Sequence, residues 1–310
     1  MLFNNIIASS LSQGKAAPLR AEDVIWAYRH FLRREPESSE VVDGHIAGCK
    51  DLRQLVENIG ASKEYEYKKY NVCSSKNEQT DLYYFFHMHK TGGTSVHEYL
   101  SDVVPKKELF PSFFSEDLMN RGSLHAHSYL SGHFGNLPLM IKSRNLRLAT
   151  TLRDPVQRGL SHYKHTLRAP ALPLYDEATT SSLEEFVFGP FGPLLFGNYQ
   201  ARLLAQLSSQ WERFLCAFDT GLNTPEHLFE LAMEGLEKIE VIGITENLRD
   251  FIARLSKAWG LPLPIKDYRV GCRPSNQLIG VSPCVEEKIR ALCAIDIKIY
   301  EQTINNLNRV

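Results

Sequence analysis

Apolar residues recur at helical spacing along the first 70 residues of the chain. One stripe follows residues 24–32 and ends before Pro36, and a second follows residues 52–59 and ends before Gly60. Proline and glycine commonly stand just beyond the end of a helix. The spacing therefore predicts a small helical region at the N-terminus.

The hydrophobic pattern changes after a polar stretch, CSSKNEQT, which has the composition of a linker. Beyond it, three apolar runs of strand length are each followed by a turn and by an apolar stripe at helical spacing, in residues 82–100, 146–167 and 241–259. Repeated strand-to-helix units predict an α/β fold with a parallel sheet flanked by helices. We expect an all-α domain over residues 1–72, a linker over 73–80 and the α/β domain over 81–310.

Several helix starts are also predicted from capping residues. Asp154 precedes a proline, Ser182 and Glu185 have the spacing of a capping box, and Thr224 and Ser282 each precede a proline. Such residues bind the first unpaired N–H groups of a helix. The helices that they begin would form layers over the sheet.

A glycine-containing loop, HKTGGTS, lies directly between the first predicted strand and its helix. Gly92 and Gly93 let the backbone approach an anion closely, the next helix supplies N–H groups, and the lysine and hydroxyl side chains add donors. The order differs from a Walker A motif because Lys90 precedes the glycines. The loop predicts a phosphate site, and the alternative is a turn that needs two glycines only for its shape.

A second basic segment follows the second predicted strand. Arg153 ends the strand and Ser161 lies in the helix after it, within a segment, residues 141–168, that holds seven basic residues and one acid. A strand end and a helix side are able to face one anion together. For Arg144, Arg147 and Arg168, which belong to the same segment, we favour a solvated surface.

Composition limits the function classes. The 310 residues are 43% hydrophobic and carry a formal net charge of −1, which fits a folded protein and gives no overall field for a nucleic acid partner. The sequence has no apolar run of 18 residues, and its first residues lack the features of a signal peptide. We expect no transmembrane segment and a cytoplasmic protein, with the inner membrane face as an alternative location.

The cysteines and histidines are the possible ligands of a metal ion. The six cysteines form no C-x-x-C pair and are expected to be free, buried thiols. Two His-x-His pairs, His87 with His89 and His125 with His127, have chelating side chains, but no suitably placed cysteine or carboxylate accompanies them. We expect no metal site.

Three motifs together resemble the carbohydrate sulfotransferases that use 3′-phosphoadenosine 5′-phosphosulfate (PAPS), especially uronyl 2-O-sulfotransferases and their bacterial relatives. They are HKTGGTS after an aromatic strand, LRDPVQRGLSHY over residues 152–163, and GITE over residues 243–246. The resemblance runs in order from about residue 82 to residue 300. It implies a P-loop-like sulfotransferase fold and transfer of a sulfuryl group to a glycan hydroxyl.

The resemblance also implies where PAPS binds. The loop of Lys90, Thr91, Gly92, Gly93, Thr94 and Ser95 would hold the 5′-phosphosulfate, and Arg153 with Ser161 would hold the 3′-phosphate. Two phosphates at opposite ends of one nucleotide need two basic sites, in agreement with this division. A later loop, YRVGCRPSN, would cover the nucleotide with Arg269 and Arg273.

Sulfuryl transfer is an in-line displacement, so catalysis depends on positioning and charge stabilisation. Lys90 would neutralise the leaving phosphate oxygen, and a histidine would take the proton of the acceptor hydroxyl. We favour His133 because SGHFG resembles the family's Gly-His segment, while His127, in a His-x-His like that of the vertebrate enzymes, stays an alternative. His125 is a third candidate for the base and is otherwise assigned to the acceptor side.

The acceptor side is also predicted from a segment, NYQAR, that resembles one near the family's acceptor cleft. Asn198 and Arg202 have groups suited to sugar hydroxyls and carboxylates. Packing of an amphipathic helix is the alternative for both. The apolar stretch FVFGPFGPLLF, residues 186–196, is expected to pack in the core rather than form a wall of the cleft.

Two other functions remain open at this point. One is an ATP-dependent phosphotransferase on a related fold, for which no clear acidic magnesium ligand is present after a strand. The other is a non-catalytic protein that binds a nucleotide or a glycan.

The N-terminal region, with YRHFLRREP over residues 28–36 and SKEY over residues 62–65, resembles a small helical domain of unknown function found on bacterial glycan-related enzymes.

Overall fold

The computed structural model describes residues 18–28, 32, 35–64, 80–112, 127–135, 144–172, 174–208, 224–268 and 281–308. His125, Arg269 and Arg273 lie outside these residues. The chain divides into two compact units, one of residues 1–77 with 140–143 and one of residues 78–139 with 144–310. The domain limits expected from the sequence stay a prediction.

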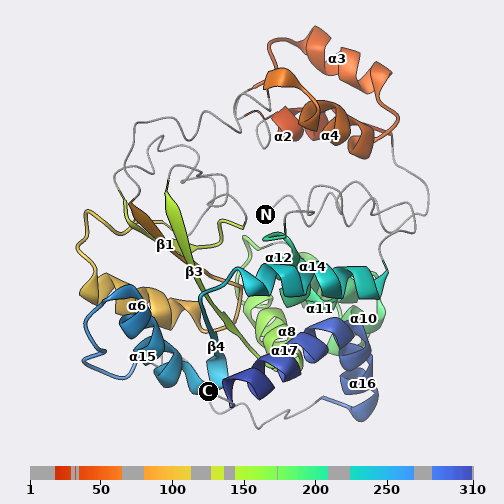
Figure 1. Ribbon diagram of the computed structural model, residues 1–310. Helices are drawn as coiled ribbons and strands as arrows, with labels where there is room; N and C mark the ends of the chain where they lie inside the picture. Colours follow the sequence, from red (N-terminus) through yellow and green to blue (C-terminus); the bar gives the residue numbers. More distant parts are fainter. Residues whose placement is uncertain are drawn as a thin grey trace. The chain divides into compact units, whose positions relative to one another are not determined.

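The described residues of the first unit form three helices, α2 (Ala21–Ala27), α3 (Ser39–Gly48) and α4 (Leu52–Gly60) (Figure 1). The two predicted apolar stripes contribute to one shared core: the side chains of Val24 and Leu55 have no exposed surface, and Ile59 is 3% exposed. Full burial of one such side chain stabilises a fold by about 1.5–3 kcal/mol. Helical periodicity in this region therefore reflects one small apolar core. The sequence analysis did not predict α3.

A parallel sheet lies at the centre of the second unit. Its strands are β1 (Asp81–Phe86), β2 (Tyr129–Gly132), β3 (Asn145–Leu152) and β4 (Val241–Ile244), in the order β2-β1-β3-β4. All three neighbouring pairs are parallel, so the carboxyl ends of the strands share one edge. The predicted parallel sheet is confirmed. The sequence analysis missed β2, a strand of four residues, YLSG, too short to form an apolar run.

Helices flank this sheet. They are α6 (Gly93–Val103), α8 (Pro155–Thr166), α9 (Tyr175–Thr180), α10 (Leu183–Phe188), α11 (Gly192–Phe196), α12 (Tyr199–Ala205), α14 (Pro225–Glu237), the 3₁₀ turn η4 (Thr245–Asn247), α15 (Leu248–Trp259), α16 (Pro283–Leu292) and α17 (Ala294–Leu307). Helices α6 and α15 lie on one side of the sheet in Figure 1, and α8 and α17 lie on the other. The predicted flanking by helices on both faces is thus confirmed.

Two apolar clusters hold these layers together. Phe85, Ala149 and Val241 of three strands pack against α6 and α15 in one cluster. In the other, α8 and α16 pack with residues of the 186–196 stretch, as the sequence analysis expected. That stretch forms α10 and α11, which its glycines and prolines separate into two short helices.

The expected caps are present where the sequence places them. The Asp154 carboxylate accepts the Gln157 N–H at 2.8 Å, and Ser182 and Glu185 bind each other's main chain as a capping box. Thr224 and Ser282 accept N–H groups of α14 and α16. Local capping chemistry was sufficient to predict these helix starts.

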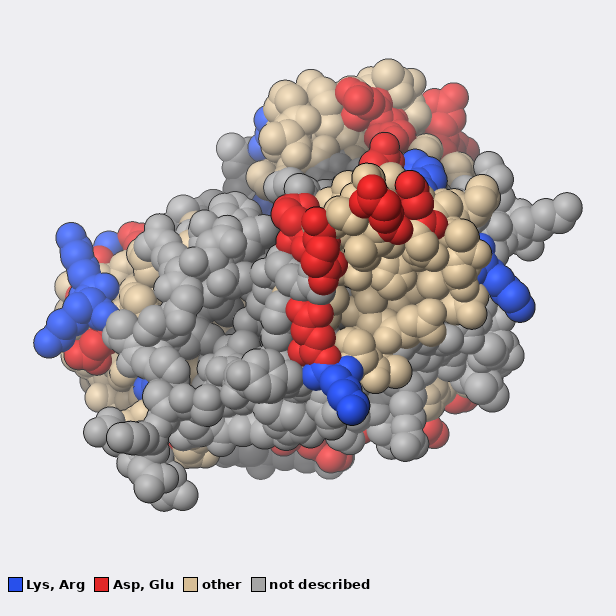
Figure 2. All heavy atoms as spheres, turned by 90° about the horizontal axis from the view of Figure 1, so that it is seen from above, with Lys and Arg blue, Asp and Glu red and all other residues tan. Residues whose placement is uncertain are grey.

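The helices, the charged surface and the thiols bear on the expectations from composition. No helix among the described residues has the length and apolar character needed to cross a membrane. Among the described residues seen in Figure 2, lysine and arginine side chains stand separately rather than as a continuous basic patch. The cysteines Cys49 and Cys293 are free and buried, whereas Cys284 is exposed, so the expectation of burial was wrong for Cys284.

Candidate functional site

The carboxyl edge of the sheet collects the segments that carry the sequence motifs. The HKTGGTS loop follows β1, His133 follows β2, Arg153 follows β3 and Thr245 follows β4. Ligands of open parallel sheets bind at this edge because loops and helix N-termini meet there. The order of the strands therefore brings the three motifs of the sequence analysis to one place.

The loop after β1 has a backbone suited to an anion. Lys90 has φ of 69° and Gly92 has φ of 85°, while Thr91 between them is not left-handed. Successive residues of opposite hand turn their N–H groups toward a common concavity that binds anions. Glycine fits at position 92 because a Cβ there would be strained by its φ and would lie 3.3 Å from Thr245 Cγ2.

The carbonyl groups of this loop accept hydrogen bonds from side chains at the ends of β3 and β4. The Thr91 carbonyl accepts hydrogen bonds from the hydroxyls of Thr151, at 2.8 Å, and Thr245, at 2.7 Å. The Lys90 carbonyl accepts Nη1 of Arg153 at 3.1 Å. Donors from the ends of β3 and β4 thus fix the acceptor groups of the loop, an arrangement that favours N–H groups on the ligand side.

The remaining loop residues take different places. The Thr91 hydroxyl is buried and donates to the Met88 carbonyl at 3.0 Å. Ser95 is buried and its N–H donates to the Gly92 carbonyl, whereas Thr94 is exposed at the first turn of α6. A Cβ on Gly93 would lie 1.8 Å from Cδ2 of His87. The side chain of Thr94 is therefore the hydroxyl that this helix start presents at the surface.

The main-chain groups of Arg153 are held in place by the side chain of Gln200. Its N–H donates to Oε1 of Gln200 at 3.0 Å, and its carbonyl accepts Nε2 of Gln200 at 2.9 Å. Ser161 lies half-buried in α8, the helix that begins directly after Arg153. The structure places Arg153, between β3 and α8, against the Lys90 loop, whereas Ser161 lies within α8.

Positive charge is concentrated at this edge. Burial lowers the pKa of Lys90, and the positive charges of Arg153 and Arg168 lower it further. Arg168 is exposed, as expected, yet it contributes to the field at Lys90. A bound anion would neutralise this repulsion, so the electrostatics of the edge favour an anionic ligand.

His133 lies beside the loop with a defined hydrogen bond. Its Nδ1 is 2.7 Å from the His87 carbonyl, and because a carbonyl only accepts, Nδ1 carries the proton and donates. The lone pair of the neutral ring is then on Nε2. Burial lowers the pKa of His133, and its hydrogen bond to His87 opposes that shift in part. The ring is therefore neutral near pH 7 and has the protonation state of a base.

The structure does not bring His127 to this edge. His127 precedes β2 and His133 follows it, so the four residues of the strand alone separate them by about 13 Å at 3.3 Å per residue. The His127 carbonyl instead accepts Nη1 of Arg144 at 2.6 Å, and the other guanidinium nitrogen, Nη2, binds the Asp81 carbonyl. The alternative that His127 is the base is not supported by this geometry.

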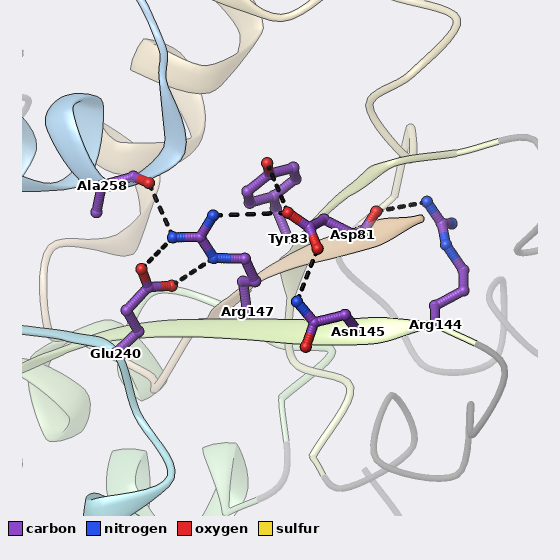
Figure 3. A network of polar contacts seen from close by, with 7 residues as sticks. All are labelled: Asp81, Tyr83, Arg144, Asn145, Arg147, Glu240 and Ala258. Atoms are coloured by element: carbon purple, nitrogen blue, oxygen red, sulfur yellow. Dashed lines mark hydrogen bonds and ion pairs between the residues drawn. The ribbon is translucent and has the colours of Figure 1, made fainter. Parts of the chain in front are cut away.

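Figure 3 shows that Arg144 and Arg147 lie in a polar network at the amino edge of the sheet. Nε and Nη2 of Arg147 both donate to the Glu240 carboxylate, and Nη1 of Arg147 lies 3.5 Å from Asp81 Oδ2. Hydrogen bonding to Glu240 raises the pKa of Arg147. The expectation of a solvated surface was wrong for these two arginines, because carboxylates and carbonyls from other parts of the chain bind them there.

Asn198 and Arg202 bind the protein itself. Oδ1 of Asn198 accepts the N–H of Ile295, at 2.9 Å, and of Asp296, at 3.3 Å, at the start of α17. Nη2 of Arg202 donates to the Leu194 carbonyl at 3.1 Å, and burial lowers the pKa of the guanidinium. Both side chains have structural roles here, and their role in binding an acceptor stays a prediction.

The sequence analysis missed three residues that support the site. Thr245 and Gln200 bind the loop and Arg153, and Tyr199 bonds to His89 at 2.7 Å. All three lie inside the GITE and NYQAR segments, so the segments were identified without the roles of these side chains. Among the residues that the structure describes, no group of three or more histidine, cysteine, aspartate or glutamate side chains is arranged to hold a metal ion.

Comparison with known proteins gives distant relatives. No protein-family profile matches the chain. A Gallus gallus protein named heparan-sulfate 6-O-sulfotransferase 2 is 25% identical over 185 residues, covering 51% of this chain and 43% of the relative. A Danio rerio protein of the same name is 28% identical over 199 residues, covering 56% and 41%. The chain thus matches less than half the length of these relatives, and the similarity supports a carbohydrate sulfotransferase as the general kind of protein.

Proposed function

We propose that this chain is a sulfotransferase that moves the sulfuryl group of PAPS to a hydroxyl group of a carbohydrate. The observation that carries the proposal is the loop from Lys90 to Gly93, whose carbonyls are bound by Thr151, Thr245 and Arg153. That arrangement would leave the N–H groups of the loop, beside Lys90 and Arg153, for the anionic end of a donor. The relatives' names support a sugar as the acceptor.

The division of the donor site follows from the two basic positions. The N–H groups of the loop, with the hydroxyl of Thr94 and the ammonium group of Lys90, would bind the 5′-phosphosulfate. Arg153 and Ser161 would bind the 3′-phosphate, since Arg153 projects from the end of β3 and Ser161 from the helix after it. Arg269 and Arg273, which lie outside the described residues, are proposed to cover the nucleotide.

His133 is the proposed base. Its Nδ1 proton is used in the bond to the His87 carbonyl, so Nε2 would accept the proton of the acceptor hydroxyl as that oxygen attacks sulfur. The sulfur–oxygen bond to the 5′-phosphate breaks on the opposite side, and the charge that forms on the phosphate oxygen would be stabilised by Lys90. No metal ion is required by this scheme.

The test is binding and turnover of PAPS by the full chain. Adenosine 3′,5′-bisphosphate should bind to the wild type, and Arg153→Ala should weaken that binding by roughly 10- to 100-fold, since a charge-assisted hydrogen bond is worth about 1.5–3 kcal/mol. Arg290→Ala is the matched control, because Arg290 is exposed on α16 and paired with Glu286. His133→Ala should lower turnover with a polysaccharide panel and leave nucleotide affinity nearly unchanged.

The same assays separate the proposal from its rivals. If ATP with magnesium binds and is consumed while PAPS is not, the chain is a phosphotransferase and the proposal is wrong. If adenosine 3′,5′-bisphosphate binds, no acceptor is sulfated and His133→Ala changes nothing, the chain is a binding protein. Loss of nucleotide binding in both Arg153→Ala and Arg290→Ala would contradict the assigned role of Arg153.

A further inference from the structure

Four imidazole rings from three parts of the second unit form a column beside the anion loop. The ring centroid of His89 lies 3.7 Å from that of His133 with an angle of 6° between the planes, and 5.7 Å from that of His162 with an angle of 7°. His87 lies on the other side of His133, at 4.2 Å. His133 is therefore held between two rings that follow β1.

The hydroxyl group of Tyr199 fixes the His89 ring, one of the two inner rings of this column. It lies 2.7 Å from Nδ1 of His89, and the tyrosine begins α12. Arg158 lies with its guanidinium carbon 4.3 Å from the centre of the Tyr199 ring. This guanidinium is fully buried and donates to the Leu195 carbonyl at 2.6 Å. The Tyr199 ring therefore forms a cation–π contact with a guanidinium whose position is fixed.

Charged and titratable groups surround the column on each side. Lys90 lies on the loop that carries His89, Arg158 and His162 are on α8, and Tyr199 is on α12. Burial lowers the pKa of His89, and positive charge on His133, His162, His87 or Arg158 would lower it further. The column is thus built to stay neutral, with each ring opposing a proton on the next.

We propose that Tyr199 and His89 are positioning residues for His133: the tyrosine hydroxyl fixes the His89 imidazole, and the stacked His89 ring fixes the plane of the His133 imidazole. The proposal rests on the assignment of His133 as the base, and it adds two residues that set the direction of its Nε2 lone pair. Stacking alone leaves a ring free to turn in its own plane, whereas the His87 carbonyl and the His89 face together fix both its rotation and its tilt.

The test compares Tyr199→Phe with Tyr163→Phe. Both changes remove one hydroxyl from a tyrosine of the second unit, and the Tyr163 hydroxyl donates to the Ala178 carbonyl at 3.3 Å. Tyr199→Phe should lower kcat on the order of tenfold, because a small misplacement of a reacting group has a large effect on rate. It should also move the acid limb of the kcat profile to higher pH and change the Kd for adenosine 3′,5′-bisphosphate less than twofold.

A measurement that needs no turnover keeps the two proposals apart. In protein labelled with ¹⁵N-histidine, the wild-type His133 should show the tautomer with a proton on Nδ1 and titrate below the ordinary value of about 6.5. Tyr199→Phe should move this titration upward, and Tyr163→Phe should not. If the wild type fails to turn over PAPS, the assignment of the base fails, and the titration alone decides whether Tyr199 and His89 position His133.

The stacking part has its own variant. His89→Phe keeps an aromatic face against His133 and removes the hydrogen-bond partner of the Tyr199 hydroxyl, so adding Tyr199→Phe to His89→Phe should produce no further loss of kcat. If Tyr199→Phe does not fold, kcat and the titration of His133 are measured in His89→Phe instead. Unchanged His133 titration in folded Tyr199→Phe, or a loss of nucleotide affinity as large as the loss of kcat, would overturn the proposal.

Discussion

The side-chain amide of Gln200 binds both polar groups of the Arg153 main chain, with the N–H of Arg153 3.0 Å from Oε1 and the carbonyl of Arg153 2.9 Å from Nε2. Gln200 is 1% exposed and lies in α12, which is distant in sequence from β3. The guanidinium of the same arginine reaches the Lys90 carbonyl. One glutamine therefore fixes the residue that joins the two proposed phosphate sites.

Replacement of this glutamine by methionine tests that relationship. Gln200→Met keeps the length of the side chain and removes both hydrogen bonds, so the free energy of unfolding should fall by about 1–3 kcal/mol. The affinity for adenosine 3′,5′-bisphosphate should fall by roughly tenfold, because Arg153 loses its fixed position. Urea denaturation and titration calorimetry measure the two effects. The exposed Gln302→Met on α17 should produce neither, and equal losses in both variants would contradict the assigned role.

The same helix start is bound by a buried carboxylate. Asp296 accepts the N–H groups of Gln200, at 3.0 Å, and Ala201, at 2.7 Å, and it is 1% exposed. Burial raises the pKa of Asp296, while its two N–H donors and the charges of Arg158 and Arg202 oppose that shift. The carboxylate therefore links α17 to the start of α12 and balances two buried arginines.

Loss of that charge should destabilise the second unit without a change in shape. Asp296→Asn is nearly isosteric, but it removes the negative charge that acts on two buried arginines and replaces one of the two acceptor oxygens by an NH2 group, so we expect a loss of about 2–3 kcal/mol in the free energy of unfolding. Chemical denaturation measures the loss. Glu301→Gln, an exposed change of the same kind on the same helix, is the control. A neutral result for Asp296→Asn would mean that neither the charge nor the second acceptor oxygen of Asp296 stabilises this helix start.

The fold and the loop were predictable from the sequence for local reasons. Strand, glycine pair and helix follow one another within residues 82–100, and the capping residues act on N–H groups two or three positions away. Such features need no knowledge of distant contacts. The choice between His133 and His127 was not of this kind, because it depends on β2, whose four residues put the two histidines at opposite ends of a strand.

The supporting residues were not predictable because their partners are distant in sequence. Thr245 binds the Thr91 carbonyl across 154 positions, and Gln200 binds Arg153 across 47. Arg147 lies between Asp81 and Glu240 for the same reason, although its local surroundings in the sequence are simply basic. A linear pattern identifies the segments that meet at the sheet edge and leaves their side-chain contacts undetermined.

Lys90 offers a test that separates stability from function. Its φ of 69° is left-handed, a conformation that costs a residue with a side chain about 1 kcal/mol relative to glycine. Lys90→Gly should therefore be more stable than Lys90→Ala by up to about 1 kcal/mol, with part of the gain offset by the freedom of the unfolded chain. Both variants should bind adenosine 3′,5′-bisphosphate more weakly than the wild type, as measured by calorimetry. Retained binding in either variant would exclude Lys90 from the donor site.

The histidine column predicts that stability falls in mild acid. Burial lowers the pKa of His87, His89 and His133, and it lowers the pKa of His162 to about 3. Between the unfolded value of about 6.5 and these lower folded values, the unfolded chain binds more protons than the folded chain, so the free energy of unfolding rises with pH. Each histidine contributes at most about 1.4 kcal/mol per pH unit in this window.

Urea denaturation between pH 8 and pH 5 measures this effect before most carboxylates titrate. The column should add no slope above pH 7.5, where its histidines are neutral in both states, and a decline should appear below pH 6.5. His162→Gln removes one titrating ring and leaves the others, so its slope between pH 6.5 and pH 5.5 should be smaller by about 1 kcal/mol per pH unit. Equal slopes in His162→Gln and the wild type would show that this ring binds protons as readily in the folded protein as in the unfolded chain, and the neutral column beside the anion loop would then be wrong.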